Sequence, residues 1–493
     1  MSLLAGADLD KDLILGLDLG TSSIKAILIN QSGAVVRKSE AKLPIRRIDN
    51  QVEQDCDEYK RALIEITSDC REFLPRISAM GLSGQTPSLL GIDERGNPTF
   101  PTLIWQDNRA TNEADELASR FGNPWNLIGT SLPWAASACP AKMLWISRNK
   151  PEWIEETRWL LQPKDYLGFL LTGEAISDPW STKGICNVKS RSSINELIEY
   201  CGWNPKVMPK IQNGFESRGR VSRSASELTG LPEGLEVSTG WSDAMCGMLA
   251  LGVFAKPTSF VITGTSAIVG TSSLKAPNDA GALYVIPDSS APLSVTYGPT
   301  QMSGGSIAWA AKLLGASEEE FVAMGDSDES DSVPIYLPYI AGERAPLWRS
   351  DIRGSFSELS IEDDQSALAR ATMEGVAFAE RQVLEISQKI SGSVPEEITL
   401  GGHAGNDPKW IKARKRTMGK KLRRISDADI TCRGSAILAH TIITGDLMES
   451  TRTLSPKSEI YEIDSLDIDY GIRNFERFLS EQSALLAKSK GGR

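Results

Sequence analysis

The chain has 493 residues, of which 41% are hydrophobic and 24% charged, and a formal net charge of −11. This length is too great for one ordinary core, so we expect two large domains in a soluble globular protein. The acidic balance argues against a nucleic-acid or anionic-membrane partner, because both normally require a basic patch. No stretch is long and apolar enough to span a bilayer, and the N-terminus lacks the signal-peptide pattern.

The cysteine and histidine content limits which metal sites and which general bases the chain can have. The seven cysteines are scattered without a Cys-x-x-Cys pair, which argues against a disulfide framework or a zinc site and predicts a reduced, cytoplasmic compartment. The only histidines are His403 and His440, too few for a multi-histidine metal site. Any general base is therefore expected to be a carboxylate, and any metal a hard cation held by oxygens.

The N-terminal pattern predicts three antiparallel strands before any helix. Buried-strand residues 13–18 are followed by a turn at 20–23, a second strand over 24–29, a turn at 30–33 and a third strand from Ala34. In a dinucleotide-binding fold a helix follows the first strand directly, so this order predicts a different α/β fold.

Further along, the pattern predicts a strand over 77–82, an irregular region over about 172–235, and helices over about 57–73, 112–121, 140–148 and 164–171. A second hairpin follows, with a strand at 259–262, a Gly-Thr-Ser turn and a strand at 267–270. Its likeness to the first hairpin predicts a duplicated domain. We place the domains at 1–245 and 246–493.

The first hairpin has the residues that a phosphate-binding loop needs. Gly20 lets the backbone approach a ligand, and the hydroxyls of Thr21 and Ser22 can donate to phosphate oxygens. Asp18, at the end of the strand, can hold Mg²⁺ directly or through water. A plain hairpin turn is the alternative for so short a pattern. The repeat of the pattern at residues 264–266 favours phosphate binding.

Ten segments, spread in order along nearly the whole chain, carry a resemblance to a known family. They are Gly16–Lys25, Gln51–Asp55, Gly81–Gln85, Ile104–Arg109, Pro163–Tyr166, Gly240–Asp243, Gly342–Pro346, Arg370–Gly375, Leu400–Ala404 and Arg433–Ala436. With them the chain resembles the FGGY carbohydrate kinases, a branch of the actin-like ATPase superfamily. The resemblance implies two ribonuclease-H-like (actin-like) α/β domains with an interdomain catalytic cleft, and ATP and Mg²⁺ as cofactors.

The sequence departs from the family pattern at several positions. His403 and Glu358 stand where glycines are usual, and Thr86-Pro87 replaces the Met-His of xylulose kinases and the Arg-Glu of glycerol kinases. Proline has no N–H, so one hydrogen bond to a ketose is missing. The resemblance still favours a pentulose such as D-xylulose as acceptor, ahead of ribulose, erythritol or glycerol.

By this resemblance Asp243 is the general base and also contacts the acceptor. It follows a predicted strand and turn and precedes a helix of small residues over 244–251. The local sequence is equally typical of a helix N-cap, a role worth about 1 kcal/mol. The two roles are compatible, since a carboxylate can begin a helix and still face a ligand.

Small residues are the candidates for nucleotide binding, and polar or aromatic residues for sugar binding. The nucleotide set is Gly20, Thr21, Ser22, Gly264, Thr265, Gly304, Gly305, Gly401, Gly402 and Ala404. Ordinary turns at helix starts are the alternative for the last five positions. The sugar set is Gln85, Trp105, Asp107 and Asp243, and the alternatives are a core tryptophan and a helix cap.

Two other function classes remain. An actin-like ATPase that gates a protein partner would share both hairpins, and a degenerate regulator would bind sugar without turnover. Trp105, Asp107 and Gly240–Asp243 favour a small-molecule pocket, and the presence of Asp18 and Asp243 favours turnover. We therefore expect a sugar or polyol as the partner, no nucleic acid, no membrane, and a homodimer as the assembly.

Overall fold

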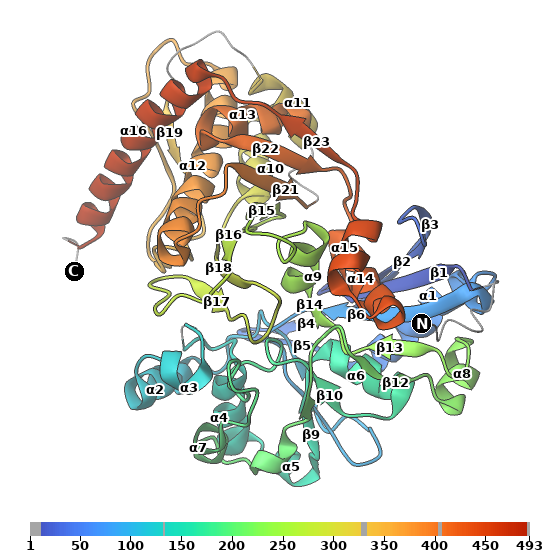
Figure 1. The fold of residues 1–493 in the computed structure, drawn as a ribbon. Helices are drawn as coiled ribbons and strands as arrows, with labels where there is room; N and C mark the ends of the chain where they lie inside the picture. Colours follow the sequence, from blue (N-terminus) through green and yellow to red (C-terminus); the bar gives the residue numbers. More distant parts are fainter. Residues whose placement is uncertain (1–10, 132–133, 327–332, 403–406, 491–493) are drawn as a thin grey trace. The chain divides into compact units, whose positions relative to one another are not determined.

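The computed structural model describes residues 11–131, 134–326, 333–402 and 407–490 (Figure 1). The chain divides into two compact units. The first comprises Met1–Ala255, Ile286–Pro292 and Asp429–Ser455, and the second comprises Lys256–Val285, Leu293–Ala428 and Pro456–Arg493. The domain boundary after residue 245 stays a prediction, but the first unit also takes in a segment from late in the chain.

The first unit is built on a seven-stranded sheet. Its main path runs β12-β13-β6-β1-β2-β3, and β14 also pairs with β6. These strands are β1 (Leu13–Leu19), β2 (Ser23–Asn30), β3 (Val35–Lys42), β6 (Ile77–Gly84), β12 (Ser217–Arg220), β13 (Glu236–Ser238) and β14 (Trp241–Ser242). Strands β1 to β3 are antiparallel, and β6 runs parallel to β1. All seven residues of β1 are buried, as expected for a strand covered on both faces.

Helices from distant parts of the chain cover this sheet. They include α1 (Cys56–Asp69), α6 (Pro163–Thr172), α9 (Asp243–Ala250) and α14 (Ile430–Thr444), and α15 (Leu447–Leu454) packs against α14. Figure 1 shows α14 beside α9 and the β1–β6 region. The contact is close because the strands carry glycine there. A Cβ atom on Gly81 would lie 1.7 Å from the Ser435 carbonyl oxygen, and one on Gly16 would lie 2.1 Å from that of Cys432.

The rest of the first unit consists of short elements. They are β4 (Arg46–Ile48), β5 (Gln51–Gln54), β7 (Leu90–Ile92), β8 (Thr102–Leu103), β9 (Trp159–Leu161), β10 (Ile176–Ser177), β11 (Lys210–Ile211), α2 (Thr111–Phe121), α3 (Trp125–Ile128), α4 (Cys139–Asn149), α5 (Pro151–Glu156), α7 (Asn195–Tyr200) and α8 (Arg223–Thr229). The region 172–235, expected to be irregular, thus contains short strands and helices. Elements of two to seven residues are too short to show a clear periodicity.

The second unit repeats the sheet pattern of the first. Its order is β17-β18-β16-β15-β21-β22-β23, made from β15 (Ser259–Thr263), β16 (Ala267–Ser273), β17 (Tyr284–Ile286), β18 (Ser294–Pro299), β21 (Glu397–Gly401), β22 (Lys421–Ile425) and β23 (Ser458–Tyr461). Strands β15, β16 and β18 are antiparallel, and β21 runs parallel to β15, as β6 does to β1. The predicted duplication of an α/β unit is confirmed.

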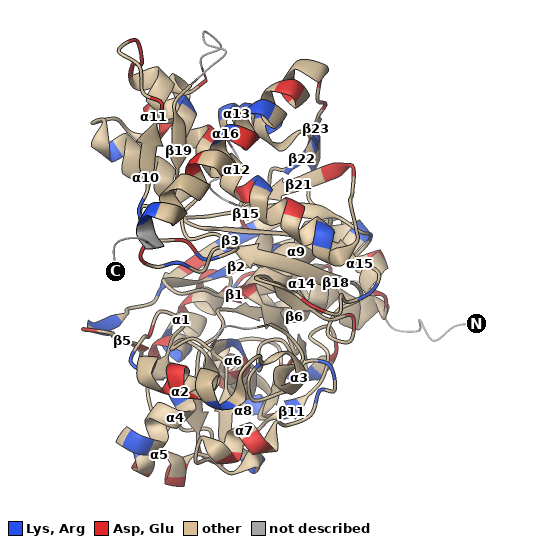
Figure 2. Ribbon diagram, turned by 90° about the vertical axis from the view of Figure 1, so that its left-hand side faces the viewer, with Lys and Arg blue, Asp and Glu red and all other residues tan. Residues whose placement is uncertain are grey.

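The remaining elements of the second unit are α10 (Gly304–Leu313), α11 (Glu318–Met324), α12 (Gln365–Ser391), α13 (Pro408–Met418), α16 (Ser465–Lys490), β19 (Ile335–Leu337) and β20 (Ser355–Ser357). Within the described ranges, no helix combines the length and apolar character that crossing a bilayer requires. Acidic and basic residues are interspersed on the helices of both units (Figure 2). All seven cysteines are buried free thiols.

The close contact between β6 and α14 predicts a large cost for a methyl group at Gly81. We expect Gly81→Ala to lower the free energy of unfolding by more than about 2 kcal/mol, because a backbone carbonyl cannot move aside as a flexible side chain can. Gly419→Ala is the control, since open space surrounds Gly419 and its φ of 64° and ψ of 22° lie in the left-handed region that other residues can also adopt. Thermal unfolding measures both variants, and equal shifts would contradict this account of the contact.

Candidate functional site

Asp18 lies at the end of β1, at the turn into β2. Its side chain is 8% exposed, and Oδ2 accepts a hydrogen bond of 2.9 Å from the Thr431 hydroxyl. Oδ1 is buried and has no hydrogen-bond partner among the described residues. Burial raises the pKa of Asp18 above its usual range. A buried carboxylate oxygen without a partner is a suitable ligand for a hard cation.

The turn after Asp18 is held by polar side chains from two other segments. Thr21 Oγ1 accepts a hydrogen bond of 2.9 Å from Trp105 Nε1 and donates at 3.4 Å to Gln85 Oε1. Gln85 Nε2 donates to Gln54 Oε1 at 2.8 Å, and Gln54 donates in turn to the Thr21 carbonyl oxygen at 2.7 Å. Ser22 is exposed. The structure therefore brings Thr21, Gln85 and Trp105 together, and it adds Gln54, which the sequence analysis missed.

Trp105 and Asp107 lie in different environments although they are two residues apart. Trp105 is 39% exposed, so its ring is available for stacking. Asp107 is fully buried, and its oxygens accept hydrogen bonds from the Val52 N–H and the Arg109 guanidinium. The expectation that Asp107 binds a sugar hydroxyl does not fit these contacts, because protein donors already occupy its carboxylate. Its ion pair with Arg109 instead anchors the segment that carries Trp105.

Asp243 is the first residue of α9, directly after β14. The N-cap is Ser242, whose hydroxyl accepts from the Met245 N–H. The alternative of Asp243 as N-cap is therefore wrong, and its carboxylate accepts instead from the neighbouring Ala244 N–H at 2.7 Å. Burial, and then the nearby charge of Asp18, raise the pKa of Asp243 to about 7, while the Ala244 N–H and the Lys183 charge oppose the rise. A carboxyl with a pKa near neutrality can take up a proton during catalysis.

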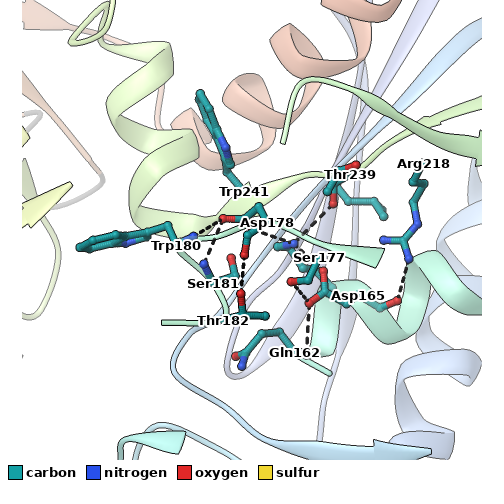
Figure 3. Close-up of polar contacts among 12 residues, drawn as sticks. Gln162, Asp165, Ser177, Asp178, Trp180, Ser181, Thr182, Arg218, Thr239 and Trp241 are labelled. Atoms are coloured by element: carbon teal, nitrogen blue, oxygen red, sulfur yellow. Dashed lines mark hydrogen bonds and ion pairs between the residues drawn. The ribbon is translucent and has the colours of Figure 1, made fainter. Parts of the chain in front are cut away.

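A buried cluster of charges holds the segments around Asp243. Lys164 forms ion pairs with Asp165 and, at 3.0 Å, with Asp178, and all three side chains are fully buried. Lys164 also donates to the Thr239 carbonyl oxygen at 3.4 Å, four residues before Asp243. Figure 3 shows Asp165, Ser177, Asp178 and Thr239 converging at this point. Although burial alone lowers the pKa of Lys164, the two carboxylates raise it overall, so the ammonium stays charged.

In the second unit the structure brings three small-residue segments together. The Gly304 N–H donates to the Gly264 carbonyl oxygen at 3.0 Å, and the Gly305 N–H donates to that of Thr265 at 2.9 Å. A Cβ on Gly402, whose φ is +94°, would lie 2.4 Å from the Thr263 carbonyl oxygen. Gly401 pairs with Ile262 across β21 and β15. We call Thr263–Thr265, Ser303–Gly305 and Gly401–Gly402 the glycine cluster; Ala404 and His403 lie outside the described residues.

A buried ion pair supports the glycine cluster. Glu380 on α12 and Arg414 on α13 are both fully buried and 2.8 Å apart. Glu380 accepts a hydrogen bond from the Ser303 hydroxyl at 2.8 Å, and Arg414 donates to the Thr263 hydroxyl at 2.8 Å. The pair thus fixes two of the three segments. Neither residue stands out in the sequence, because a charged residue in an amphipathic helix gives no sign of burial.

Together with the expectation that the glycine cluster binds nucleotide, the contacts of Glu380 predict that Glu380→Gln weakens nucleotide binding as well as the fold. Breaking one partner of a buried ion pair costs about 3–5 kcal/mol, and the freed Ser303 and Thr263 side chains would loosen the cluster. We expect a lower unfolding temperature and an ATP KM at least about fivefold higher.

The matched control is Glu374→Gln on the same helix. Glu374 is 2% exposed, and its polar partners among the described residues are Arg370 at 2.9 Å, Arg416 at 3.7 Å and the Tyr470 hydroxyl at 2.6 Å, none of which belongs to the glycine cluster. The Glu374→Gln variant should have a lower unfolding temperature and an ATP KM within about twofold of that of the unmodified chain. Equal changes of ATP KM in both variants would refute the positioning role of Glu380.

Both units contain sequence that matches a known protein family. The N-terminal domain of the FGGY family of carbohydrate kinases matches residues 13–250, and its C-terminal domain matches residues 260–441. A xylulose kinase of Bacillus subtilis (strain 168) is 26% identical over 440 residues, covering 86% of this chain and 87% of that protein. A gluconokinase of the same organism is 26% identical over 447 residues, covering 86% of each.

A solved structure has a similar fold over most of the chain. The crystal structure of a xyloylose kinase from Brucella ovis superposes with a TM-score of 0.89 and 27% sequence identity, covering 96% of this chain and 99% of that one. The matches extend in order across both units and support the fold implied by the resemblance, two actin-like domains. The chain therefore belongs to the FGGY family of carbohydrate kinases and is an ATP-dependent sugar kinase.

Proposed function

We propose that the chain transfers the γ-phosphoryl group of ATP to a hydroxyl of a small sugar, with D-xylulose as the leading acceptor and Asp243 as the general base. The observation that carries the role of Asp243 is its place at the start of α9, with its pKa raised to about 7 and the Asp18 carboxylate nearby. The xylulose kinases among the relatives support the acceptor. Because one relative is a gluconokinase, a sugar acid is an alternative acceptor. Ribulose, erythritol and glycerol are further alternative acceptors.

In the proposed reaction Asp243 accepts the proton of the acceptor hydroxyl. The hydroxyl oxygen forms a bond to the γ-phosphorus, the bond between that phosphorus and the β–γ bridging oxygen breaks, and ADP leaves with the electron pair. Such transfers depend on positioning and charge stabilisation more than on covalent chemistry. General-base catalysis contributes about 10²- to 10⁴-fold.

We propose Asp18 as the residue that holds Mg²⁺, directly or through water. Its buried, unpartnered Oδ1 fits a hard cation. When bound, Mg²⁺ neutralises charge on the phosphates. Thr431 keeps the Asp18 side chain in place through its hydrogen bond to Oδ2.

The other predicted ligands divide between the two units. Gly20, Thr21 and Ser22 in the first unit, and the glycine cluster in the second, are proposed to bind the nucleotide through backbone N–H groups and hydroxyls. The proposal is supported by the start of α10 at Gly304, since a helix N-terminus favours phosphate. Gln85 and Trp105 are proposed sugar contacts, and Asp107 is proposed to position Trp105.

The cellular setting also stays a prediction. We propose a cytoplasmic enzyme without nucleic-acid or membrane partners, supported by its seven free thiols and its acidic charge. A homodimer is the expected assembly, and sedimentation would determine it.

An acceptor screen tests the function, and Asp243→Asn tests the base. ADP release should require a sugar, and mass spectrometry should detect its phosphate ester. We expect Asp243→Asn to lower kcat by at least about 100-fold, because an amide cannot take up the proton. ADP release that responds to protein partners and to no sugar would refute the acceptor class. Unchanged sugar-dependent turnover in Asp243→Asn would refute the base.

Asp243 should also make the stability of the fold depend on pH. An ordinary Asp carboxyl has a pKa of 3.8, whereas that of folded Asp243 is about 7. Between these values the folded chain keeps a proton that the unfolded chain releases, so the stability falls as the pH rises through about 4 to 7. In Mg²⁺-free buffer we expect Asp243→Asn to be more stable than the unmodified chain by about 1–2 kcal/mol at pH 8 and by less at pH 5.

Denaturant titrations at the two pH values measure this difference. Asp288→Asn, at an exposed position, is the control and should show the same small effect at both. A stabilisation by Asp243→Asn that is larger at pH 5 than at pH 8 would contradict the raised pKa.

A further inference from the structure

The turn at residues 178–183 is held rigidly in the first unit. Asp178 Oδ2 accepts hydrogen bonds of 3.0 Å from the N–H groups of Trp180 and Ser181. The Thr182 hydroxyl donates to the Asp178 carbonyl oxygen at 2.8 Å. The ion pair between Asp178 and Lys164 fixes this turn to α6. Figure 3 shows Asp178, Trp180, Ser181 and Thr182 grouped around these contacts.

Lys183, at the end of this turn, is a buried cation with few protein partners. Only 8% of its surface is exposed. Its Nζ donates to the Trp180 carbonyl oxygen at 3.2 Å and lies 5.0 Å from the centre of the Trp180 ring. Among the described residues no carboxylate lies within ion-pair distance of Nζ, and no second protein oxygen accepts from it. An ammonium can donate three hydrogen bonds, so two remain for a ligand.

One of the groups whose charge acts on Lys183 is Asp243, the proposed base. Burial lowers the pKa of Lys183, and the nearby Cys139, Asp178 and Asp243 oppose this fall. The Lys183 charge in turn lowers the pKa of Asp243. Cys139 donates from Sγ to the Ser88 carbonyl oxygen at 3.5 Å, next to Thr86-Pro87. The next residue, Gly184, packs on Pro140, since a Cβ there would lie 2.8 Å from Pro140 Cδ. Lys183 therefore lies near the Cys139 segment that reaches Ser88 and Pro87, and its charge acts on the proposed base.

The chemistry of an ammonium limits what it can select. It donates and never accepts, and its hydrogen bonds are strongest to electron-rich oxygens such as a carbonyl or a carboxylate. A site that hydrogen-bonds one polar group of a substrate discriminates strongly against analogues lacking it. A polyol offers only hydroxyls, whose oxygens are weaker acceptors for a charged donor.

We propose that Lys183 is a specificity-determining residue, whose ammonium donates to a carbonyl or carboxylate oxygen of the acceptor and so selects oxo-sugars and sugar acids over simple polyols. This inference rests on the proposed function, and it names the acceptor class more narrowly. In this proposal the Lys183 ammonium also supplies a hydrogen-bond donor in place of the one that Pro87 lacks.

Three acceptors test the proposal. D-xylulose carries a carbonyl, D-gluconate a carboxylate, and xylitol is the polyol that matches xylulose with its carbonyl reduced. ADP release gives kcat and KM for each, and an acceptor that is not turned over is measured as a competitive inhibitor. The unmodified chain should favour xylulose or gluconate over xylitol by at least about tenfold.

Lys183→Met removes the donor, and Lys183→Arg keeps a charged one. We expect Lys183→Met to raise the KM of the favoured acceptor about 10- to 100-fold, with a smaller change in kcat, and to change xylitol less than about threefold. Lys183→Arg should restore at least part of the preference. Lys189→Met is the matched control, since Lys189 is exposed yet also lies over a tryptophan ring, that of Trp125, at 4.1 Å.

The outcomes separate this inference from the proposed function. A loss confined to xylulose identifies the carbonyl as the ligand, and a loss confined to gluconate identifies the carboxylate. Equal losses for all three acceptors, or a preference of the unmodified chain for xylitol, would overturn the role of Lys183 while sugar phosphorylation stands. Absence of turnover with every sugar in the unmodified chain would overturn the proposed function and this inference with it. If Lys183→Met fails to fold, Lys183→Gln and Lys183→Arg give the same comparison.

Discussion

Much of the proposed acceptor site depends on one buried ammonium and the two carboxylates that neutralise it. Lys164 lies out of solvent between Asp165 and Asp178, and a charge in such a place is tolerated only when it is paired and hydrogen-bonded. Pairing fixes α6, the turn that carries Lys183, and the carbonyl oxygen of Thr239 before Asp243. A local electrostatic requirement thus positions groups that lie far apart in the sequence.

The second unit also contains a buried ion pair that holds proposed ligand-binding segments in place. Glu380 and Arg414 join α12 to α13 and hold Ser303 and Thr263. In both units, groups proposed to bind substrate or carry out the chemistry are attached to ion pairs that face no solvent. Buried pairs of this kind contribute little net stability against an apolar replacement, but breaking one partner is costly. In this chain the buried ion pairs fix the relative positions of the segments that they join, and an apolar contact would fix those positions less precisely.

The positions of the main strands and helices could be predicted well from the sequence. The strands of both hairpins and helices α2, α4 and α6 lie within a few residues of their expected positions, because buried strands and amphipathic helices have strong periodic patterns. The proximity of Gly264, Gly304 and Gly401 was not visible in any local pattern and came from the family resemblance. The hydrogen bonds from Arg109 to the Asp107 carboxylate could not be predicted, because nothing in the sequence shows that the two side chains meet. Lys164 and Glu380 were missed for the same reason, since burial of a charge depends on tertiary partners.

The late segment 429–455 makes the first unit depend on residues that follow much of the second unit in the sequence. Helix α14 packs against β1 and β6 through glycines at residues 16 and 81, yet it is synthesised after most of the second unit. On the ribosome, the first sheet must therefore wait with one face uncovered while about 170 further residues emerge, roughly 10 to 35 s at ordinary rates of elongation. The order of synthesis and the order of folding differ in this chain, and a nascent chain released before residue 430 would keep an apolar sheet face open to chaperones and to aggregation.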